Sequence, residues 1–181
     1  VSAVEDEFGY ASMQVVSLPD LYGGKLCAAM DRQHPRDLFD VKILLETKSI
    51  DRSLFEGFLT YILSHKRPMA EILAPRWKDN SLMFKQEFFG MTTVPISLDE
   101  INQVPEHMVR ELRKYFTQGD YDFLASFKKG EPDWSLAFSE TLKNLPAIKW
   151  KLLNIQKMSP TKRDKSIAKL EKVMDYWLAS K

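Results

Sequence analysis

Apolar residues recur at the spacing of an α-helix along most of this chain. Ser17-Leu-Pro-Asp20 has the pattern of a helix start, with a proline near the first helical position, and it predicts a helix over 17–32. Pro35 ends that helix, because a proline disfavours helical backbone in the residue before it. Further periodic runs predict helices over 36–47 and 51–65.

Helix caps and breakers punctuate the second half of the chain. Ser97 and Glu100 have the spacing of a capping box, which predicts a helix start at Ser97. Pro105 is expected to interrupt this helix, and a helix over 106–117 is expected to follow until Gly119 stops it. The remaining pattern predicts helices over 120–128 (ended by Gly130), 134–145, 147–157 and from Pro160 onward, the last with the apolar stripe Ile167, Leu170, Val173, Met174, Trp177 and Leu178.

Two segments lie outside these helices. Residues 13–16 are partly β-branched and bounded by Ser17, which predicts a short strand. Residues 83–95 are compatible with a strand or a packed loop, so no conformation is predicted for 76–96. The expected fold is mostly α, a short N-terminal strand followed by a helical bundle, and the strand requires a sheet that these residues do not supply.

The composition is that of a globular protein. The chain has 181 residues, 44% of them hydrophobic, and its 7 Gly and 9 Pro are too few for low complexity. No apolar run has the length of a membrane-spanning helix, and the start of the chain lacks the features of a signal peptide. The single cysteine, Cys27, excludes an internal disulfide and fits a reducing cytoplasm. Since the chain starts at Val1, we expect it to be part of a longer protein.

The formal net charge of +1 hides an uneven distribution. Residues 1–20 contain four acidic and no basic side chains, whereas residues 142–181 contain ten basic and three acidic ones. A basic tail of this kind can bind a polyanion through counterion release. It can also be a solvated helix surface, which we favour because no aromatic residue is expected on the same face. The four tryptophans, Trp77, Trp134, Trp150 and Trp177, are instead expected to anchor the core.

A compact group of charges between residues 25 and 40 is the main candidate for chemistry. Lys25 and Arg32 are seven residues apart and therefore share one face of the first predicted helix. On the second predicted helix, Asp37 and Asp40 lie away from the polar side. Carboxylates in such a position are expected to be ion-paired, to cap a helix, or to face a cleft.

Structural and functional interpretations of this group remain open. Asp37 lies in the first turn of its helix, where a negative charge is stabilised by about 0.3–1 kcal/mol. Asp40 can pair with Arg36, and Arg32 can clamp either carboxylate across the intervening turn. In the functional interpretation, Lys25, Arg32 and Arg36 hold phosphates, while an aspartate helps with a metal or with orientation.

Gly23 and Gly24 lie inside the first predicted helix, where each costs about 0.8–1 kcal/mol relative to alanine. Such a pair indicates close packing against the entry strand, or close approach of the backbone to a ligand. No histidine lies at metal-ligand spacing from Cys27, so no metal site is predicted, and Cys27 is expected to be buried and unreactive.

The residues Leu18-Pro19, Lys25-Leu26, Arg32 and Pro35-Arg36-Asp37-Leu38-Phe39-Asp40 follow one another in a recognisable order. This order resembles the third conserved block of the AbiEii/AbiGii nucleotidyltransferase toxins. In that block, a helix with a lysine is followed by an arginine, an Arg-Asp pair that opens the next helix, and a second aspartate. Gly24 departs from the block, since many relatives carry an acidic residue there. Softer similarity continues at 121–124, 130–134, 145–150 and Asn154.

This resemblance implies a polymerase-β-like nucleotidyltransferase, an α+β parent protein, acting as the toxin of a bacterial toxin–antitoxin or abortive phage infection system. The parent would use Mg²⁺ and a nucleoside triphosphate (NTP), transfer nucleotides to an acceptor such as tRNA, and have a cognate antitoxin as partner. Lys25, Arg32 and Arg36 would bind the nucleotide, and Asp37 and Asp40 would be catalytic.

The resemblance also implies a division of the chain and a missing part. Residues 1–48 would end the nucleotidyltransferase domain, and 49–181 would form its helical C-terminal domain. The family's first two blocks, a Gly-Ser turn and metal-binding carboxylates on a sheet, are expected before Val1, so this chain alone is expected not to transfer nucleotides. The alternative is a noncatalytic helical module that binds an antitoxin protein or nucleic acid through its basic C-terminal tail.

Overall fold

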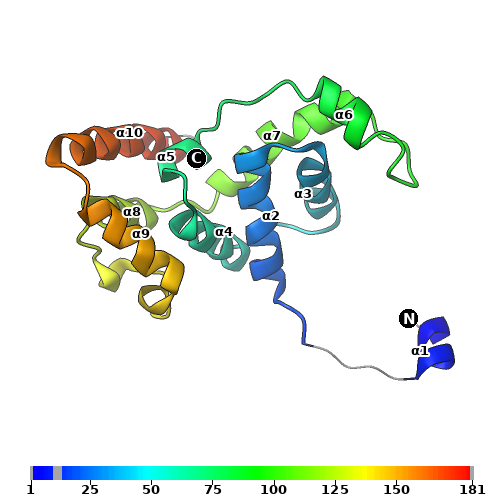
Figure 1. Ribbon diagram of the computed structural model, residues 1–181, viewed down its shortest axis with the longest axis horizontal. Helices are drawn as coiled ribbons and strands as arrows, with labels where there is room; N and C mark the ends of the chain where they lie inside the picture. Colours follow the sequence, from blue (N-terminus) through cyan, green and yellow to red (C-terminus); the bar gives the residue numbers. More distant parts are fainter. Residues whose placement is uncertain (1, 10–13, 180–181) are drawn as a thin grey trace.

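The computed structural model describes residues 2–9 and 14–179, and all regular structure in this part of the chain is helical (Figure 1). The helices are α1 (Ser2–Phe8), α2 (Leu18–Arg32), α3 (Pro35–Thr47), α4 (Arg52–Ser64), α5 (Met69–Leu73), α6 (Ser81–Glu87), α7 (Leu98–Arg113), α8 (Gln118–Lys129), α9 (Pro146–Gln156) and α10 (Pro160–Leu178), with the 3-10 turns η1 (Trp134–Leu136) and η2 (Leu142–Asn144). The prediction of a mostly α fold is therefore confirmed. Among these helices, none has the length and apolar character needed to cross a bilayer.

The predicted N-terminal strand is not formed. Residues 14–17 are irregular, with Val15 and Val16 exposed, and Met13 lies outside the described residues. β-branched residues favour a strand only where a neighbouring strand accepts their backbone hydrogen bonds. Within 2–9 and 14–179 there is no such neighbour, so the chain enters α2 from an irregular segment.

The three helices predicted over 17–65 are confirmed as α2, α3 and α4, to within the usual uncertainty of helix ends. Each begins at a side-chain cap. The Ser17 hydroxyl accepts from the backbone N–H of Asp20 at 3.3 Å, and the Asp51 carboxylate accepts from that of Leu54 at 2.8 Å. These local hydrogen bonds explain why sequence alone located the helix starts.

Pro105 does not interrupt a helix, contrary to prediction. It lies inside α7, which runs without a break from the Ser97 cap to Arg113. A proline inside a helix costs about 3 kcal/mol, but the buried apolar stripe of α7 has members both before and after Pro105. Burial of this whole stripe outweighs the local cost; its members are Ile101, Val104, Met108 and Leu112.

Two further predictions in the second half are wrong. Gly119 does not stop a helix but lies in the first turn of α8, because Thr117 and Asp120 form a capping box that starts this helix. The segment 134–145 contains only η1 and η2, since Asp133 accepts hydrogen bonds from the backbone and hydroxyl of Ser135 and so competes with a regular helix. Gly130 ends α8 as predicted, with a φ of 92°. Within the segment left open, 81–87 forms α6.

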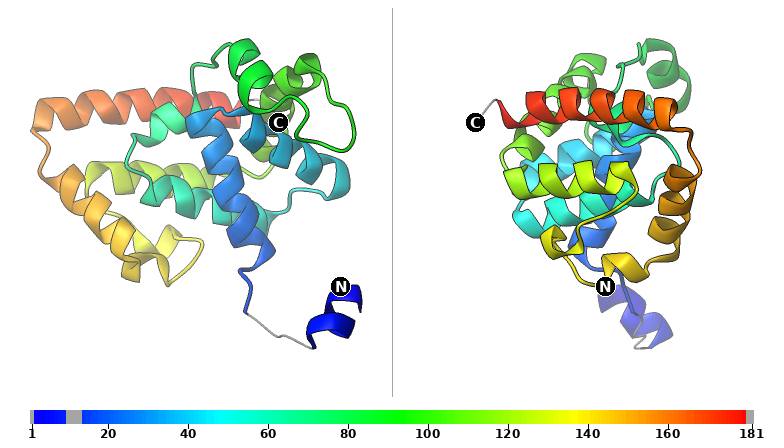
Figure 2. Two further views of the ribbon diagram at one scale, coloured as in Figure 1. Left: turned by 45° about the vertical axis from the view of Figure 1, so that its right-hand side comes forward. Right: turned by 90° about the vertical axis from the view of Figure 1, so that its left-hand side faces the viewer.

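α2 lies in the middle of the helical body and packs most extensively on α4 (Figures 1 and 2). The two backbones touch at a pair of glycines. A Cβ on Gly23 would lie 2.5 Å from the carbonyl carbon of Gly57, and a Cβ on Gly57 would lie 2.3 Å from the carbonyl oxygen of Pro19. Close packing is therefore the reason for Gly23, with α4 as the partner in place of the expected strand.

The aromatic core joins the last helix to the middle of the chain. Trp177 of α10 is fully buried, stacks on Phe58 with ring centroids 6.4 Å apart, and meets Phe116 edge-on at 5.8 Å. Its indole N–H donates to the backbone carbonyl of Leu73 at 3.0 Å. The apolar ring is therefore packed and the polar N–H has a hydrogen-bond partner, as a buried tryptophan requires.

Lys151 of α9 closes the C-terminal end of α4. Its ammonium group donates to the backbone carbonyls of Ile62, His65 and Arg67 at 2.9, 2.7 and 3.1 Å. A helix ends with carbonyls that have no partner in the helix, and this lysine satisfies them from another element. Burial, with a smaller contribution from Lys128, lowers the pKa of Lys151 to about 8 from its ordinary 10.5.

This pKa predicts how stability depends on pH. Between pH 8 and 9 the unfolded chain binds more protons at Lys151 than the folded protein does, so the contribution of this residue to stability should rise with pH. Below pH 8 the folded protein bears the full cost of the buried charge. We expect the free energy of unfolding of the wild type, measured in urea at pH 8 and pH 9, to rise by up to about 1.4 kcal/mol per pH unit more than that of Lys151→Met. The exposed neighbour provides a control, since Lys149→Met should keep the wild-type profile; identical profiles for all three proteins would contradict the assignment.

Candidate functional site

Two ion pairs join α2 to α3 in the region of the predicted charged group. Lys25 Nζ lies 2.6 Å from Asp40 Oδ2, and Arg32 Nη2 lies 2.7 Å from Asp37 Oδ1. Only two residues connect these helices, so α3 folds back along α2 (Figure 1). Of the three alternatives expected for carboxylates on this face, ion pairing is the one formed, and Arg32 clamps Asp37 across the turn.

The two ion pairs differ in how far their carboxylates are exposed to solvent. The Asp37 side chain is 8% exposed and that of Arg32 is 63% exposed, while Lys25 and Asp40 are each 40% exposed. Solvent-exposed ion pairs contribute at most about 1 kcal/mol to stability. The pair between Lys25 and Asp40 therefore does little for the fold, and both cations remain accessible, oriented side chains suited to bind phosphate oxygens.

Gln33 fixes the turn between the two helices. Its φ of 59° lies in the left-handed region that residues with a side chain rarely adopt. Two hydrogen bonds offset this strain: its amide donates to the carbonyl of Arg76 at 3.1 Å and accepts from the backbone N–H of Lys78 at 2.8 Å. The turn, with Arg32 just before it, is thus tied to the segment 76–78.

Arg36 is directed away from the two ion pairs. Its Nε and Nη2 donate to the carbonyl oxygen of Glu87 at 3.2 and 2.9 Å, at the end of α6. His34 also contacts Glu87, at 3.1 Å from its carboxylate, and caps α3 by accepting from the backbone N–H of Arg36. The predicted pair between Arg36 and Asp40 is not formed, because Asp40 is bound by Lys25 from the neighbouring helix.

The cluster does not fit a divalent metal ion. Mg²⁺ is held by oxygen ligands at about 2.0–2.1 Å, and no group of three His, Cys, Asp or Glu side chains that could hold a metal occurs in the described ranges. Asp37 and Asp40 are each committed to one cation. An Asp-x-Asp spacing at Asp120 and Asp122 does not supply ligands either, because Asp120 is buried and accepts two hydrogen bonds from Arg52.

Cys27 is buried, as predicted, and has no catalytic geometry. Burial, and to a lesser extent Asp31, raises the pKa of this thiol to about 12, so the reactive thiolate is not formed at neutral pH. Asp31 accepts from Arg67 at 2.6 Å and lies 3.4 Å from Nε2 of His65. The nearby carboxylate and imidazole therefore belong to an ion-pair network and do not activate the cysteine.

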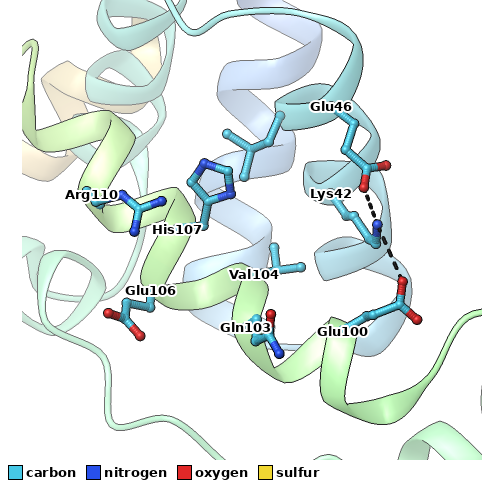
Figure 3. Close-up of a pocket in the computed structure, with 9 residues that line it drawn as sticks. Lys42, Glu46, Glu100, Gln103, Val104, Glu106, His107 and Arg110 are labelled. Carbon is cyan, nitrogen blue, oxygen red and sulfur yellow. Dashed lines mark hydrogen bonds and ion pairs between the residues drawn. The ribbon is translucent and has the colours of Figure 1, made fainter.

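A cleft of about 610 Å³ lies between α3 and α7 (Figure 3). Lys42 pairs with Glu46 on its own helix and lies 3.8 Å from Glu100 on α7. His107 and Arg110 line the other wall. Because its charges have both signs and Lys42 already faces two carboxylates, this cleft presents no concentrated charge for a phosphate.

α9 presents a basic surface, within the basic tail seen in the sequence, whose exposed aromatic residue was not predicted. Trp150 is 60% exposed, in contrast to the predicted core position that Trp177 does occupy. Helical periodicity could have predicted this exposure, since Trp150 lies off the stripe of Ile148 and Ile155 that faces the core. Three exposed lysines lie within seven residues of it along the chain. We call this the α9 surface: Lys143, Lys149, Trp150, Leu153 and Lys157.

One protein family matches most of the chain. The model of the family described as "Nucleotidyl transferase AbiEii toxin, Type IV TA system" matches residues 1–153 of 181. The match includes both ion pairs between α2 and α3, whereas α10 lies outside it. Neither a curated protein nor a solved structure matches the chain.

Proposed function

Because this chain belongs to the AbiEii nucleotidyl transferase toxin family, we propose that it supplies phosphate-binding residues to the nucleotidyl transfer site of such a toxin. The observation that carries the proposal is the pair of accessible cations, Lys25 and Arg32, each held by an aspartate of α3. The substrate would be an NTP, the acceptor an RNA such as tRNA, and the protein partner a cognate antitoxin.

Nucleotidyl transfer depends on holding the triphosphate and neutralising the charge that develops on it. Lys25 would contact a phosphate oxygen as a point charge, and Arg32 would contact one through its planar guanidinium. Asp40 and Asp37 would act as positioning residues that keep these cations in place. Arg36 would join through the remaining N–H groups of its guanidinium, since Nε and Nη2 each donate one hydrogen bond to the Glu87 carbonyl.

Mg²⁺ would supply further neutralisation of the phosphates when bound. The donor set of residues 2–9 and 14–179 does not fit this ion, so its ligands are expected from another part of the parent protein. The chain alone is accordingly expected not to transfer nucleotides.

Lys25→Ala in the intact toxin is expected to relieve growth arrest while the protein still folds. Loss of an exposed ion pair costs at most about 1 kcal/mol of stability, whereas loss of a charge that stabilises the transition state costs about 10²-fold in rate. Growth of expressing cells and thermal unfolding of the purified variant measure the two effects separately.

Lys48→Ala is the matched control. Lys48 is an exposed lysine just after α3, and it forms no ion pair with any described residue, so this variant should stay fully toxic. A well-folded Lys25→Ala protein that is as toxic as Lys48→Ala would rule out the role given to Lys25.

A second candidate function is nucleic-acid binding by a noncatalytic helical module, and the α9 surface favours it. No acidic residue occurs from Thr141 to Arg163. Within the part of the chain that the structure describes, the lysines of this surface form no ion pair. Trp150 offers a ring face for base stacking, the aromatic component expected to be missing from the basic tail.

Charge reversal tests this second function. Lys149→Glu with Lys157→Glu should weaken binding of single-stranded RNA and reduce the slope of log K against log salt by about 0.7 per lost phosphate contact. Trp150→Ala should weaken binding by about 1–3 kcal/mol without changing that slope. Reversal of Lys162, Arg163 and Lys165 tests the adjoining start of α10. Filter binding at several salt concentrations measures all variants, and unchanged affinity throughout would reject this face as the contact.

A further inference from the structure

We propose that a cleft between α7, the C-terminal end of α10 and the segment 73–80 binds a nucleotide. We call it the Trp77 cleft. Its volume is about 670 Å³, and its lining residues include Trp77, Asn80, Asn102, Arg110, Arg113 and Tyr176. The three elements converge beside the end of α10 (Figures 1 and 2). Lys25, Asp37 and Asp40 do not line this cleft, so the site goes beyond the proposed transfer site.

Asn80 is the residue that points most directly to a ligand. It is only 6% exposed and lines the cleft, yet its amide makes no hydrogen bond with any described residue. No fully buried side-chain nitrogen or oxygen in the described ranges lacks a partner, so the unpartnered amide atoms of Asn80 must touch solvent, and Asn80 lines this cleft. An amide presents a donor and an acceptor side by side, the arrangement that pairs with the edge of a nucleobase.

The cleft also provides aromatic surface. Trp77 and Tyr176 are both exposed and both line it. Tyr176 is already occupied, because the guanidinium of Arg113 lies 4.0 Å from its ring centroid and donates to its backbone carbonyl. The ring of Trp77 forms no ring contact within the described part of the chain. A base can therefore stack on Trp77 while its edge meets Asn80.

The charges of the cleft suit a single phosphate. Lys78, Arg110 and Arg113 line it together with Asp79 and Glu106, which leaves a small positive balance. Arg113 is committed to the end of α10 and Asp79 to the start of α6. Arg110 is exposed and only loosely paired, with its Nε 3.7 Å from Glu111, and Lys78 donates to the Arg32 carbonyl at 3.5 Å. Both side chains keep free N–H groups that can contact one phosphate group. A nucleoside monophosphate unit, free or at the end of an RNA, has this chemistry.

Isothermal titration calorimetry of the purified protein tests the proposal, with the four ribonucleoside monophosphates and ribose 5-phosphate in buffer without Mg²⁺. At least one nucleotide should bind about tenfold or more tightly than ribose 5-phosphate, because only the nucleotide can stack. Asn80→Ala should lower the affinity for that nucleotide about tenfold. It should leave thermal stability unchanged, since the amide has no hydrogen bond within the protein to lose. Asn144→Ala, at an exposed amide elsewhere, should change neither.

Two further measurements are needed. The first distinguishes a free nucleotide from an RNA end as the occupant of the Trp77 cleft, and the second distinguishes this cleft from the proposed transfer site. A short single-stranded RNA ending in the preferred nucleotide should compete at the same site, and tighter binding than the free nucleotide would identify an RNA end as the occupant. Lys25→Ala should bind the nucleotide as the wild type does, so a failure of the transfer-site proposal would leave this result intact. Absence of saturable binding by any nucleotide or RNA, equal binding of ribose 5-phosphate, or undiminished binding by Asn80→Ala would overturn the proposal.

Discussion

Gly23→Ala is expected to lower the free energy of unfolding by about 3 kcal/mol, although alanine is the better helix former. The added Cβ would lie 2.5 Å from the carbonyl carbon of Gly57 and 2.7 Å from the backbone nitrogen of Phe58. Both atoms belong to the backbone of α4, so only a separation of α2 from α4 relieves the clash. That movement would open the core around Phe58, and equilibrium unfolding in urea measures its cost.

Gly24→Ala is the matched control, because it makes the same change one residue later in the same helix. Its Cβ would lie 3.1 Å from the ring of Tyr61, an exposed side chain that can move aside. The gain of about 1 kcal/mol in helix propensity should offset this adjustment, so little net change is expected. Equal destabilisation by the two variants would contradict the backbone contact as the cause.

Asp120→Asn is expected to lower the free energy of unfolding by about 3 kcal/mol, because it removes the charge of the buried member of an ion pair. Asp120 is 3% exposed and accepts from Arg52 Nη1 and Nη2 at 2.6 and 2.7 Å. The hydrogen bond that Arg52 donates to this carboxylate is the main cause of the raised pKa of Arg52. The same carboxylate accepts from the backbone and hydroxyl of Thr117, so one substitution weakens both the α8 cap and its link to α4. Thermal and urea unfolding measure the loss.

Asp122→Asn controls for the loss of a negative charge on the same helix. Asp122 is exposed and accepts only from the side chain of Gln118, at 2.8 Å, among the described residues. This substitution should change stability by less than about 0.5 kcal/mol. Similar losses for the two variants would show that net charge, and not the buried pair, determines the effect.

The sequence predicted those parts of the fold that depend on neighbouring residues. Ser17, Asp51 and Ser97 start helices through hydrogen bonds within one turn, and Gly130 ends one in the same way. Pro105 was misjudged because its helix is maintained by apolar burial against distant elements, which a local rule does not include. The division at residue 48 stays a prediction.

In the candidate site, too, the sequence predicted what depends on neighbouring residues and not what depends on tertiary packing. Helical periodicity placed Lys25 and Arg32 on one face of the first helix and Asp37 and Asp40 away from the polar side of the next. The structure pairs these cations with these carboxylates. The partner of Arg36 could not be predicted, because the Glu87 carbonyl comes from a helix whose position depends on tertiary packing. The Trp77 cleft was beyond sequence reasoning for the same reason, since its walls come from three distant segments.

The position of Trp177 has a consequence for how this protein is made. The family match ends at residue 153, yet the indole of Trp177 fills the space between Phe58 and Phe116 and donates to Leu73. During translation, the earlier helices therefore emerge from the ribosome with this aromatic gap unfilled. The core can close only after α10 has left the exit tunnel, so the native packing around Trp177 is complete only after the residues of α10 have been synthesised.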